Sequence, residues 1–235
     1  MRIFMLTGAG ISAESGLGTF RDPGGIWERF DPMKLATPEA FARDPDTVHA
    51  FYNARRANLR DAAPNAAHAA LARLEQGLAS MGGELFLCTQ NIDDLHEQAG
   101  MRHVLHMHGE LFKVRCTACG AVHEWRGDLG RQDACPACGT TGRLRPHIVW
   151  FGEIPFGLDM IGEKLADADL FVAVGTSGSV YPAAGFVQEA RAMGLRTCEL
   201  NLEPSDNARV FDERAYGPAS EVVPDFVERV LREIR

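Results

Sequence analysis

Two short polar motifs contain residue types that could perform acid–base chemistry. The motif QNID contributes Asn91 and Asp93, the motif HMH contributes His106 and His108, and each motif follows a short apolar run. An asparagine amide donates and accepts hydrogen bonds and an aspartate accepts them, so Asn91 and Asp93 could hold an amide group of a ligand. The two histidines alternate along an extended segment, and a side chain that titrates near neutral pH can act as a general base. The spacing alone also allows structural histidines or zinc ligands.

A glycine-rich segment, GAGISAESG at residues 8–16, follows the first apolar run of the chain. Glycines at this place allow backbone N–H groups to approach a pyrophosphate at the start of a helix. The segment departs from the G-x-G-x-x-G pattern of dehydrogenases because Glu14 and Ser15 occupy part of the turn. Arg21 follows and could bridge phosphates, although a plain tight turn would need the glycines as well.

Two further polar segments follow apolar runs, GTS at residues 175–177 and NLE at residues 201–203. The asparagine and glutamate of the second segment suit ribose hydroxyls. Open α/β sheets bind ligands at the carboxyl ends of their strands. Together with the glycine-rich segment, these positions predict a dinucleotide site.

Four cysteines form two C-x-x-C pairs, Cys116 with Cys119 and Cys135 with Cys138, and a glycine follows each pair. Two residues between thiolates allow both sulfurs to reach one ion, and glycine permits the turn. Four protein ligands leave no open coordination position, so the pattern predicts one structural Zn²⁺. Two disulfides or a redox pair are the alternatives.

One arginine lies on the apolar face of an expected helix. Val48, Tyr52 and Arg55 share this face, whereas Arg56 and Arg60 lie on neighbouring faces where they reach water. An arginine that faces a core needs an anion there, and an internal salt bridge could supply it. The alternative is a pocket in which Tyr52 and Arg55 receive the carboxylate of a substrate, with the guanidinium binding it through two parallel hydrogen bonds.

These residues require a scaffold of parallel strands. Short apolar runs alternate with helical patterns, which is typical of βαβ units and of a buried parallel sheet. The runs lie at residues 3–6, 85–88, 104–107, 170–174 and 197–202. Residues 27–77 have a helical pattern with starts at Asp44-Pro45 and Pro64-Asn65, and the C-terminal segment predicts an amphipathic closing helix.

Length and composition set limits on this scaffold. The 235 residues suffice for one α/β domain with smaller inserts, and the formal charge of −8 disfavours a nucleic-acid partner, which needs a basic surface. No run approaches the roughly 20 apolar residues of a membrane span, so no membrane partner is expected. Four paired cysteines, with Cys88 and Cys198 in apolar runs, suit a reducing compartment, and the expected location is cytoplasmic.

In combination the motifs resemble those of the sirtuins, the family of NAD-dependent protein-lysine deacylases. The matching motifs are GAGISAESG (8–16), TFR (19–21), QNID (90–93), HMHG (106–109), the four cysteines, IVWFGE (148–153), GTS (175–177) and NLE (201–203). The resemblance implies an α/β fold with a Rossmann-like parallel sheet and a small domain made of a zinc-ribbon insert and a helical insert. The implied limits are 1–26, 78–114 and 146–235 for the large domain, 27–77 for the helical insert and 115–145 for the zinc insert.

The resemblance also implies that acyl groups are removed from lysine side chains. NAD is then a consumed co-substrate, and nicotinamide, O-acyl-ADP-ribose and free lysine are the products. By motif, His108 would be the base that acts on the nicotinamide-side ribose, while Asn91 and Asp93 would hold the carboxamide. The residues that would bind NAD are Gly8, Ala9, Gly10, Ile11, Ser12, Ala13, Thr19, Phe20, Arg21, Trp27, Gln90, Asn91, Ile92, Asp93, Gly175, Thr176, Ser177, Asn201, Leu202, Glu203 and Ala219.

Acyl-lysine peptides would add as a strand between two segments of the chain, a case of β-augmentation. The residues implied on the peptide side are Val149, Phe151, Gly152, Gly178 and Val180. Tyr52 and Arg55 resemble the Tyr-x-x-Arg motif of class III sirtuins, which favour succinyl and malonyl over acetyl groups. The alternative function is a protein mono-ADP-ribosyltransferase that uses the same NAD site.

Overall fold

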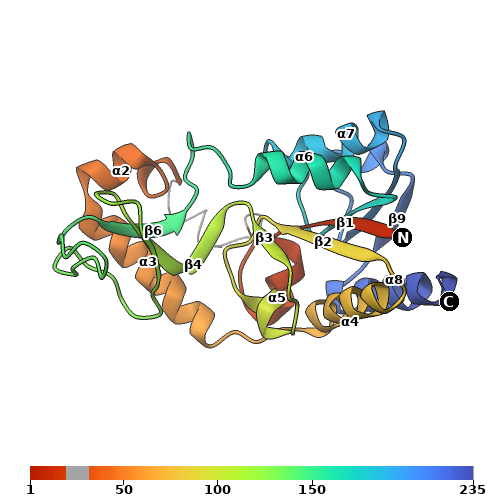
Figure 1. The fold of residues 1–235 in the computed structure, drawn as a ribbon, viewed down its shortest axis with the longest axis horizontal. Coiled ribbons are helices and arrows are strands. Elements are labelled where there is room, and N and C mark those ends of the chain that lie inside the picture. The colour runs from red at the N-terminus through yellow and green to blue at the C-terminus, as the bar shows by residue number, and fades with distance from the viewer. Residues whose placement is uncertain (20–31, 235) are drawn as a thin grey trace.

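The computed structural model describes residues 1–19 and 32–234 of the chain. Its centre is a parallel sheet in the order β3-β2-β1-β7-β8-β9 (Figure 1). The strands are β1 (Arg2–Thr7), β2 (Glu84–Thr89), β3 (Val104–His106), β7 (Leu170–Val174), β8 (Arg196–Asn201) and β9 (Glu213–Tyr216). The predicted parallel sheet is therefore confirmed, because the five apolar runs form all of these strands except β9.

The order of the strands reverses at β1. The chain adds β2 and β3 on one side of β1 and then β7, β8 and β9 on the other. In open parallel sheets, ligands bind outside the carboxyl ends of the strands where the order reverses. Thr7 at the end of β1 lies beside Thr89 of β2 and Val174 of β7, so the loops that follow these three residues are neighbours.

Helices cover both faces of this sheet (Figure 1). The helices are α4 (Ala66–Ser80) and α8 (Ala219–Glu233) on one face, and α6 (Leu158–Ala166) and α7 (Phe186–Ala192) on the other. Side chains of β1 alternate between the two cores, with Met5 on the α4 and α8 side and Phe4 on the α6 and α7 side. Burial on both faces explains why the sequence of β1 is a continuous apolar run. The predicted closing helix is α8.

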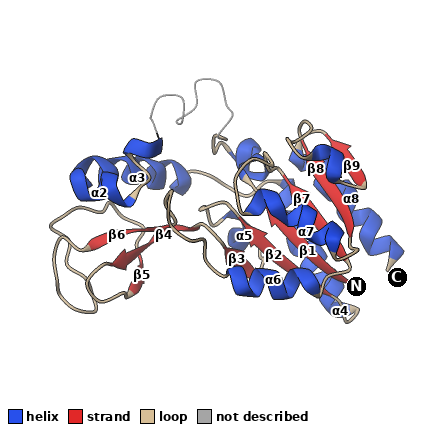
Figure 2. Cartoon of the chain, turned by 90° about the horizontal axis from the view of Figure 1, so that it is seen from above, coloured by secondary structure: helices blue, strands red, loops and turns tan. Residues whose placement is uncertain are grey.

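A smaller lobe lies beside the sheet (Figure 2). Its elements are α2 (Pro38–Arg43), α3 (Pro45–Arg60) and an antiparallel sheet of β4 (Gly109–Cys116), β5 (Val122–Glu124) and β6 (Leu144–Ile148). Both predicted helix starts are confirmed. Asp44 Oδ1 accepts from Thr47 N–H at 3.1 Å to cap α3, and Asn65 Oδ1 accepts from Ala67 N–H at 2.9 Å to cap α4.

Several features of the fold were not predicted from the sequence. β9 is a parallel edge strand whose exposed sequence has no apolar run. α4 packs against α8 and the large sheet, although most of it falls within the expected helical insert at residues 27–77. We therefore propose that this insert ends before Ala66. We also propose that the zinc insert extends from Gly109 to Ile148, because β4 and β6 belong to the antiparallel sheet of the smaller lobe.

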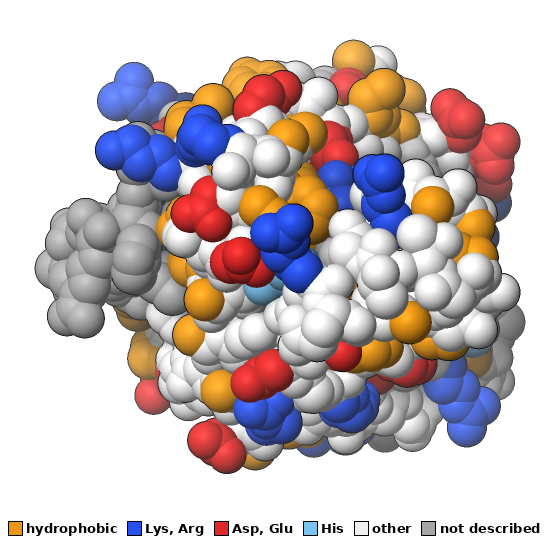
Figure 3. Space-filling model, turned by 90° about the vertical axis from the view of Figure 1, so that its left-hand side faces the viewer, with side chains coloured by type: hydrophobic (Ala, Val, Ile, Leu, Met, Phe, Trp, Pro, Cys, Tyr) orange, Lys and Arg blue, Asp and Glu red, His pale blue; other side chains and the backbone are white. Residues whose placement is uncertain are grey.

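Charges of both signs are interspersed on the end of the molecule that Figure 3 shows, which belongs to the smaller lobe. On this face, lysine and arginine side chains alternate with aspartate and glutamate side chains instead of forming one basic surface. Among the helices of residues 1–19 and 32–234, none has the length and apolar character that crossing a bilayer requires.

Candidate active site

The glycine-rich segment packs directly against the loop after β7. Gly8 N–H donates to Val174 O at 2.9 Å, and Gly10 N–H donates to Gly175 O at 2.8 Å. A Cβ atom on Gly10 would lie 2.7 Å from Gly175 Cα, which real structures essentially never show. Gly175 itself has a φ of +61°, a conformation that favours glycine. The glycines thus allow two backbone segments to approach closely, and the short 3₁₀ helix η1 (Ala9–Ser15) begins at this contact.

Side chains from this segment and from the QNID motif form a buried hydrogen-bonded group. Asn91 Nδ2 donates to Gly8 O and to Ser12 Oγ, in both cases at 3.2 Å. Ser12 Oγ donates to Asp93 Oδ2 at 3.1 Å, and Asp93 Oδ1 accepts from Leu95 N–H at 3.2 Å. Burial raises the pKa of Asp93, and the hydrogen bonds from Leu95 and Ser12 oppose this rise. The structure thus brings an amide and a carboxylate together beside the glycine-rich segment.

His68 connects this group to the N-terminus of α4. Its Nδ1 atom accepts from Asn65 N–H at 3.3 Å, so the ring proton belongs on Nε2, which lies 3.4 Å from Ser12 Oγ. Burial lowers the pKa of His68 to about 4, and the ring is therefore neutral at neutral pH. Because the His68 imidazole donates to Ser12 Oγ, the hydroxyl of Ser12 directs its own proton to Asp93.

The two histidines of the HMH motif have different surroundings. His106 Nε2 lies 2.7 Å from Glu97 Oε1, and His106 Nδ1 lies 3.2 Å from Asn91 O. Burial by itself would lower the pKa of His106, but the Glu97 carboxylate raises it above its ordinary value. His108 Nδ1 donates to Gln90 O at 3.0 Å, and burial lowers the pKa of His108. Within the described residues, His108 Nε2 has no hydrogen-bond partner and can accept a proton, whereas both nitrogens of His106 are engaged.

The segments after β7 and β8 form the adjacent part of the site. Gln90 Nε2 donates to Thr176 Oγ1 at 3.0 Å, and Asn201 Nδ2 donates to Thr176 O at 2.9 Å. Thr176 therefore connects the QNID, GTS and NLE motifs at one edge of the sheet. Leu202 and Glu203 have exposed side chains and lie at the margin of this group.

Four further predicted NAD-binding residues fall into two groups. Phe20, Arg21 and Trp27 lie outside the described residues. Ala219 begins α8 next to Ser220, whose backbone N–H and hydroxyl donate to the carboxylate of Glu14 in η1 at 2.8 and 2.6 Å. The start of α8 is thereby attached to the glycine-rich segment.

Tyr52 and Arg55 lie one turn apart on α3. Tyr52 is 1% exposed, and its hydroxyl accepts from Trp150 Nε1 at 2.9 Å. Arg55 is half-buried, and burial lowers the pKa of its guanidinium while electrostatic interactions with Tyr52 and Asp93 oppose this. A cation on α3 is therefore within electrostatic range of the carboxylate that follows β2.

The prediction that Arg56 reaches water is wrong. Its side chain is 0% exposed, Nε donates to Leu111 O at 2.9 Å, and Nη1 donates to Asn53 Oδ1 at 2.9 Å. Arg56 faces β4, which covers this side of α3, and spacing within the helix cannot reveal a neighbour from another part of the chain. Arg60 is exposed, as predicted.

The two segments expected to flank a peptide have exposed apolar side chains. Phe151 is 47% exposed and Val180 is 41% exposed. Val149 N–H donates to His108 O at 2.9 Å, so the first segment begins beside the candidate base. Each segment contains a glycine with positive φ, Gly152 (+86°) and Gly178 (+72°).

The four paired cysteines converge at one end of the smaller lobe. Cys116 Sγ lies 3.8 Å from Cys138 Sγ, and Cys119 Sγ lies 3.8 Å from Cys135 Sγ. All four sulfurs lie within 4.8 Å of one another. A tetrahedron of sulfurs around Zn²⁺, with Zn–S distances of about 2.3 Å, has edges of about 3.8 Å. The donor set therefore fits one structural Zn²⁺, and the thiols are too far apart for disulfides.

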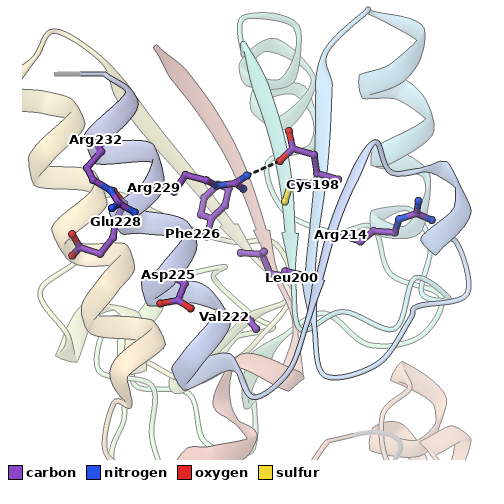
Figure 4. Close-up of a pocket in the computed structure, with 11 residues that line it drawn as sticks. Cys198, Leu200, Arg214, Val222, Asp225, Phe226, Glu228, Arg229 and Arg232 are labelled. Atoms are coloured by element: carbon purple, nitrogen blue, oxygen red, sulfur yellow. Dashed lines mark hydrogen bonds and ion pairs between the residues drawn. The ribbon is translucent and has the colours of Figure 1, made fainter.

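A cavity of about 720 Å³ lies apart from these residues, between α8 and the strands β8 and β9 (Figure 4). Some of its charged groups bind one another, as Arg229 Nη1 does with Glu213 Oε2 at 3.1 Å. None of its described lining residues belongs to a motif that predicts the site. The cavity is therefore not assigned to the active site.

Reasoning from the sequence did not single out Trp150 or His68. Trp150 stands between Val149 and Phe151, and alternation along an extended segment directs it to the opposite side from these two neighbours. That alternation is the sequence signal that could have predicted a contact between Trp150 and α3. His68 stands three residues after the helix cap Asn65, where its ring can reach back to the cap.

Comparison with known proteins agrees with this geometry. The model of the Sir2 family matches residues 8–182. The chain is 64% identical to an NAD-dependent protein deacylase of Caulobacter vibrioides, over 100% of this chain and 98% of that protein. It is 56% identical to an NAD-dependent protein deacylase of Escherichia coli K12, over 100% of this chain and 84% of that protein.

Solved structures of Sir2 proteins have the same fold. A complex of a Sir2 homologue with NAD is 39% identical, with a TM-score of 0.88 over 100% of this chain and 91% of the other. A Sir2 protein bound to a myristoylated histone peptide is 33% identical, with a TM-score of 0.75 over 99% of this chain and 92% of the other. Since the family model, the full-length relatives and the arrangement of the motifs agree, the chain belongs to the Sir2 family of NAD-dependent protein-lysine deacylases.

Proposed function

We propose that this enzyme removes acidic acyl groups, succinyl and malonyl as well as acetyl, from protein lysine side chains with NAD as co-substrate. The observation that carries the acyl preference is the position of Arg55, one turn from Tyr52 and within electrostatic range of Asp93. A guanidinium binds a carboxylate through two parallel hydrogen bonds, and a phenol hydroxyl adds one more donor. An acetyl group has no carboxylate and gains nothing from this pair.

The residues around the glycine-rich segment have complementary roles in this proposal. NAD, when bound, supplies the nicotinamide leaving group and the ADP-ribose that accepts the acyl group. Asn91 and Asp93 hold the carboxamide, because an amide and a carboxylate together match its C=O and NH₂ groups. His108 Nε2 accepts a proton from a ribose hydroxyl, since its Nδ1 proton already binds Gln90 O.

The acylated peptide binds as an added strand beside Val149 and Val180. The exposure of Phe151 and Val180 supports this position, because apolar side chains there would be covered by the peptide. The hydrogen bond from Val149 N–H to His108 O also supports it, since it joins the peptide-side segment to the base.

The carboxylate role of Arg55 is tested with one peptide that carries acetyl-, malonyl- or succinyl-lysine. Arg55→Met is expected to lower kcat/KM for the succinyl peptide at least tenfold more than for the acetyl peptide, since a hydrogen bond to a charged group contributes about 1.5–3 kcal/mol. Arg60→Met is the matched control, because Arg60 lies on the same helix and donates to Arg126 O instead. Equal losses on both peptides would show that Arg55 does not bind the acyl carboxylate.

Mass spectrometry of the products distinguishes the deacylase from a mono-ADP-ribosyltransferase. Free lysine together with O-acyl-ADP-ribose is expected. A protein that gains ADP-ribose while its acyl-lysine remains intact would support the transferase.

We also propose a cytoplasmic location. The support for it is that the six cysteines are free thiols, four of them grouped as zinc ligands and two buried.

A further inference from the structure

Trp150 and Tyr52 form a buried donor–acceptor pair between the IVWFGE motif and α3. Trp150 Nε1 donates to Tyr52 Oη at 2.9 Å, and the two side chains are 2% and 1% exposed. Among the described residues, this hydroxyl makes no other hydrogen bond. Burial also raises the pKa of Tyr52, so the phenol keeps its proton at neutral pH.

The indole of Trp150 is held in place from several sides. The Arg145 guanidinium carbon lies 3.3 Å from the centre of its ring, and Trp150 backbone N–H donates to Glu153 Oε2 at 2.8 Å. Glu153 in turn binds Arg145 through two hydrogen bonds, at 2.7 and 3.0 Å. The ring of Phe41 lies 5.4 Å from the Trp150 ring, centre to centre. The direction of the indole N–H is therefore determined by contacts with Arg145, Glu153 and Phe41.

The chemistry of the pair determines what Tyr52 can offer. An indole nitrogen donates and never accepts, whereas a phenol hydroxyl has one proton and two acceptor positions. Tyr52 must therefore accept from Trp150, and its own proton cannot be given to this neighbour. A guanidinium stacked on the indole also withdraws electron density from the ring, which strengthens the N–H as a donor. The proton of Tyr52 thus remains for an anionic acceptor beside Arg55.

We propose that Trp150 is a positioning residue for acyl specificity: its indole N–H forces the Tyr52 hydroxyl to act as a hydrogen-bond donor to the carboxylate of an acidic acyl group. This inference rests on the proposed preference for succinyl- and malonyl-lysine. The residues that determine this preference then include Trp150 of the peptide-side segment, in addition to Tyr52 and Arg55 of α3. The Arg145–Glu153 pair contributes indirectly, because it holds Trp150 in place.

The test compares Trp150→Phe with the unmodified enzyme on acetyl- and succinyl-lysine versions of one peptide, at saturating NAD. Phenylalanine keeps an aromatic ring but removes the N–H. The ratio of kcat/KM for the succinyl peptide to kcat/KM for the acetyl peptide is expected to fall about tenfold, through a higher KM for the succinyl peptide. This ratio is measured on one enzyme preparation, so a smaller folded fraction cancels from it.

Two further variants separate positioning from a general structural effect. Trp125→Phe is the matched control, because Trp125 Nε1 donates to Asp128 O at 3.0 Å in the smaller lobe, away from Tyr52, and the ratio is expected to stay constant. In a Tyr52→Phe background, Trp150→Phe is expected to cause no further fall in the ratio, since the hydroxyl that it positions is absent. Circular dichroism melting of every variant confirms that each is folded at the assay temperature.

The outcomes are distinct for the two proposals. An unmodified enzyme with no activity on the succinyl peptide would overturn the acyl preference and this inference together. An active unmodified enzyme whose ratio is unaffected by Trp150→Phe would overturn the inference alone. A fall of the same size in the Tyr52→Phe background would also overturn it, because the effect would then not pass through the phenol.

Discussion

Ser12 Oγ donates a hydrogen bond to Asp93 Oδ2 at 3.1 Å, and this bond joins the segment after β1 to the segment after β2, 81 residues apart in the chain. Burial raises the pKa of Asp93, and the serine hydroxyl is one of two donors that counteract this. His68 Nε2, 3.4 Å from the serine oxygen, holds the hydroxyl in the orientation that serves Asp93. A buried acceptor on this edge of the sheet therefore depends on three separate parts of the chain.

Ser12→Ala is expected to move the acid limb of activity to higher pH. The variant loses a donor to the carboxylate, so the pKa of Asp93 rises further and the ionised acceptor requires a higher pH. A loss of about 1.5 kcal/mol corresponds to a shift of about one pH unit. The pH profile of kcat/KM for NAD measures the shift. Ser15→Ala is the control, since Ser15 Oγ accepts from Asn65 Nδ2 and does not touch Asp93. An unmoved acid limb in Ser12→Ala would contradict the role of this bond.

His108→Ala is expected to abolish turnover, because the variant lacks the nitrogen that accepts the ribose proton. In the unmodified enzyme, burial lowers the pKa of His108 from 6.5, and the base acts in its neutral form. Activity that depends on His108 is therefore complete above pH 6.5 and is lost only as pH falls through the lower pKa. His103→Ala serves as the control, since the His103 ring is exposed and bonds to Glu75. An acid limb centred above pH 7 would contradict this assignment.

Removal of zinc is expected to destabilise the smaller lobe. The apolar cluster around the paired cysteines contains only Val114, Cys116, Leu129, Cys135 and Leu144 among the described buried residues. Because this core is small, the bound ion is expected to supply the stability that a larger core would provide. Cys119→Ser should lose the metal and melt at least about 5 °C lower, as a loss of a few kcal/mol does for a chain of this length. Metal content and circular dichroism melting give the result. Cys198→Ala should retain one Zn²⁺ per chain, because Cys198 lies in β8. Full stability of Cys119→Ser without zinc would contradict the structural role of the ion.

Gly10→Ala is expected to destabilise the fold, whereas Gly162→Ala is expected to stabilise it. A Cβ atom on Gly10 would meet Gly175 Cα at 2.7 Å, and overpacking of this kind costs about 1–3 kcal/mol. Gly162 lies within α6 with nothing within 4 Å of an added Cβ, and alanine in a helix gains about 0.5–1 kcal/mol over glycine. Denaturant unfolding measures both free energies. A Gly10→Ala variant as stable as the unmodified chain would show that the two loops can separate without cost.

Net charge explains why local donors matter in this enzyme. At −8 the chain as a whole repels both NAD and an acidic acyl-lysine. Attraction must therefore come from groups at short range, such as the backbone amides of η1 and the guanidinium of Arg55. Figure 3 agrees with this conclusion, because neither basic nor acidic side chains dominate the face that it shows.

The sequence alone predicted the features that depend on residues close together in the chain. The spacing of Cys116, Cys119, Cys135 and Cys138 predicted the zinc site, apolar runs predicted five of the parallel strands, and Asp44 and Asn65 predicted two helix starts. It also placed Asn91, Asp93 and the glycine-rich segment at the ends of strands, where a parallel sheet brings them together.

The burial of the polar groups and the partner that each of them binds depend on the tertiary structure. Helical spacing predicted that Arg56 reaches water, and this is wrong because β4 covers Arg56. No pattern within α3 indicates that β4 is its neighbour. The spacing within the motif HMH did not distinguish its histidines. The structure does so through Glu97, which engages His106 and leaves His108 Nε2 available. The bond from Trp150 to Tyr52 likewise spans 98 residues. Burial and hydrogen bonding are set by whichever segments the fold brings into contact, and local sequence patterns carry little information about partners so far away.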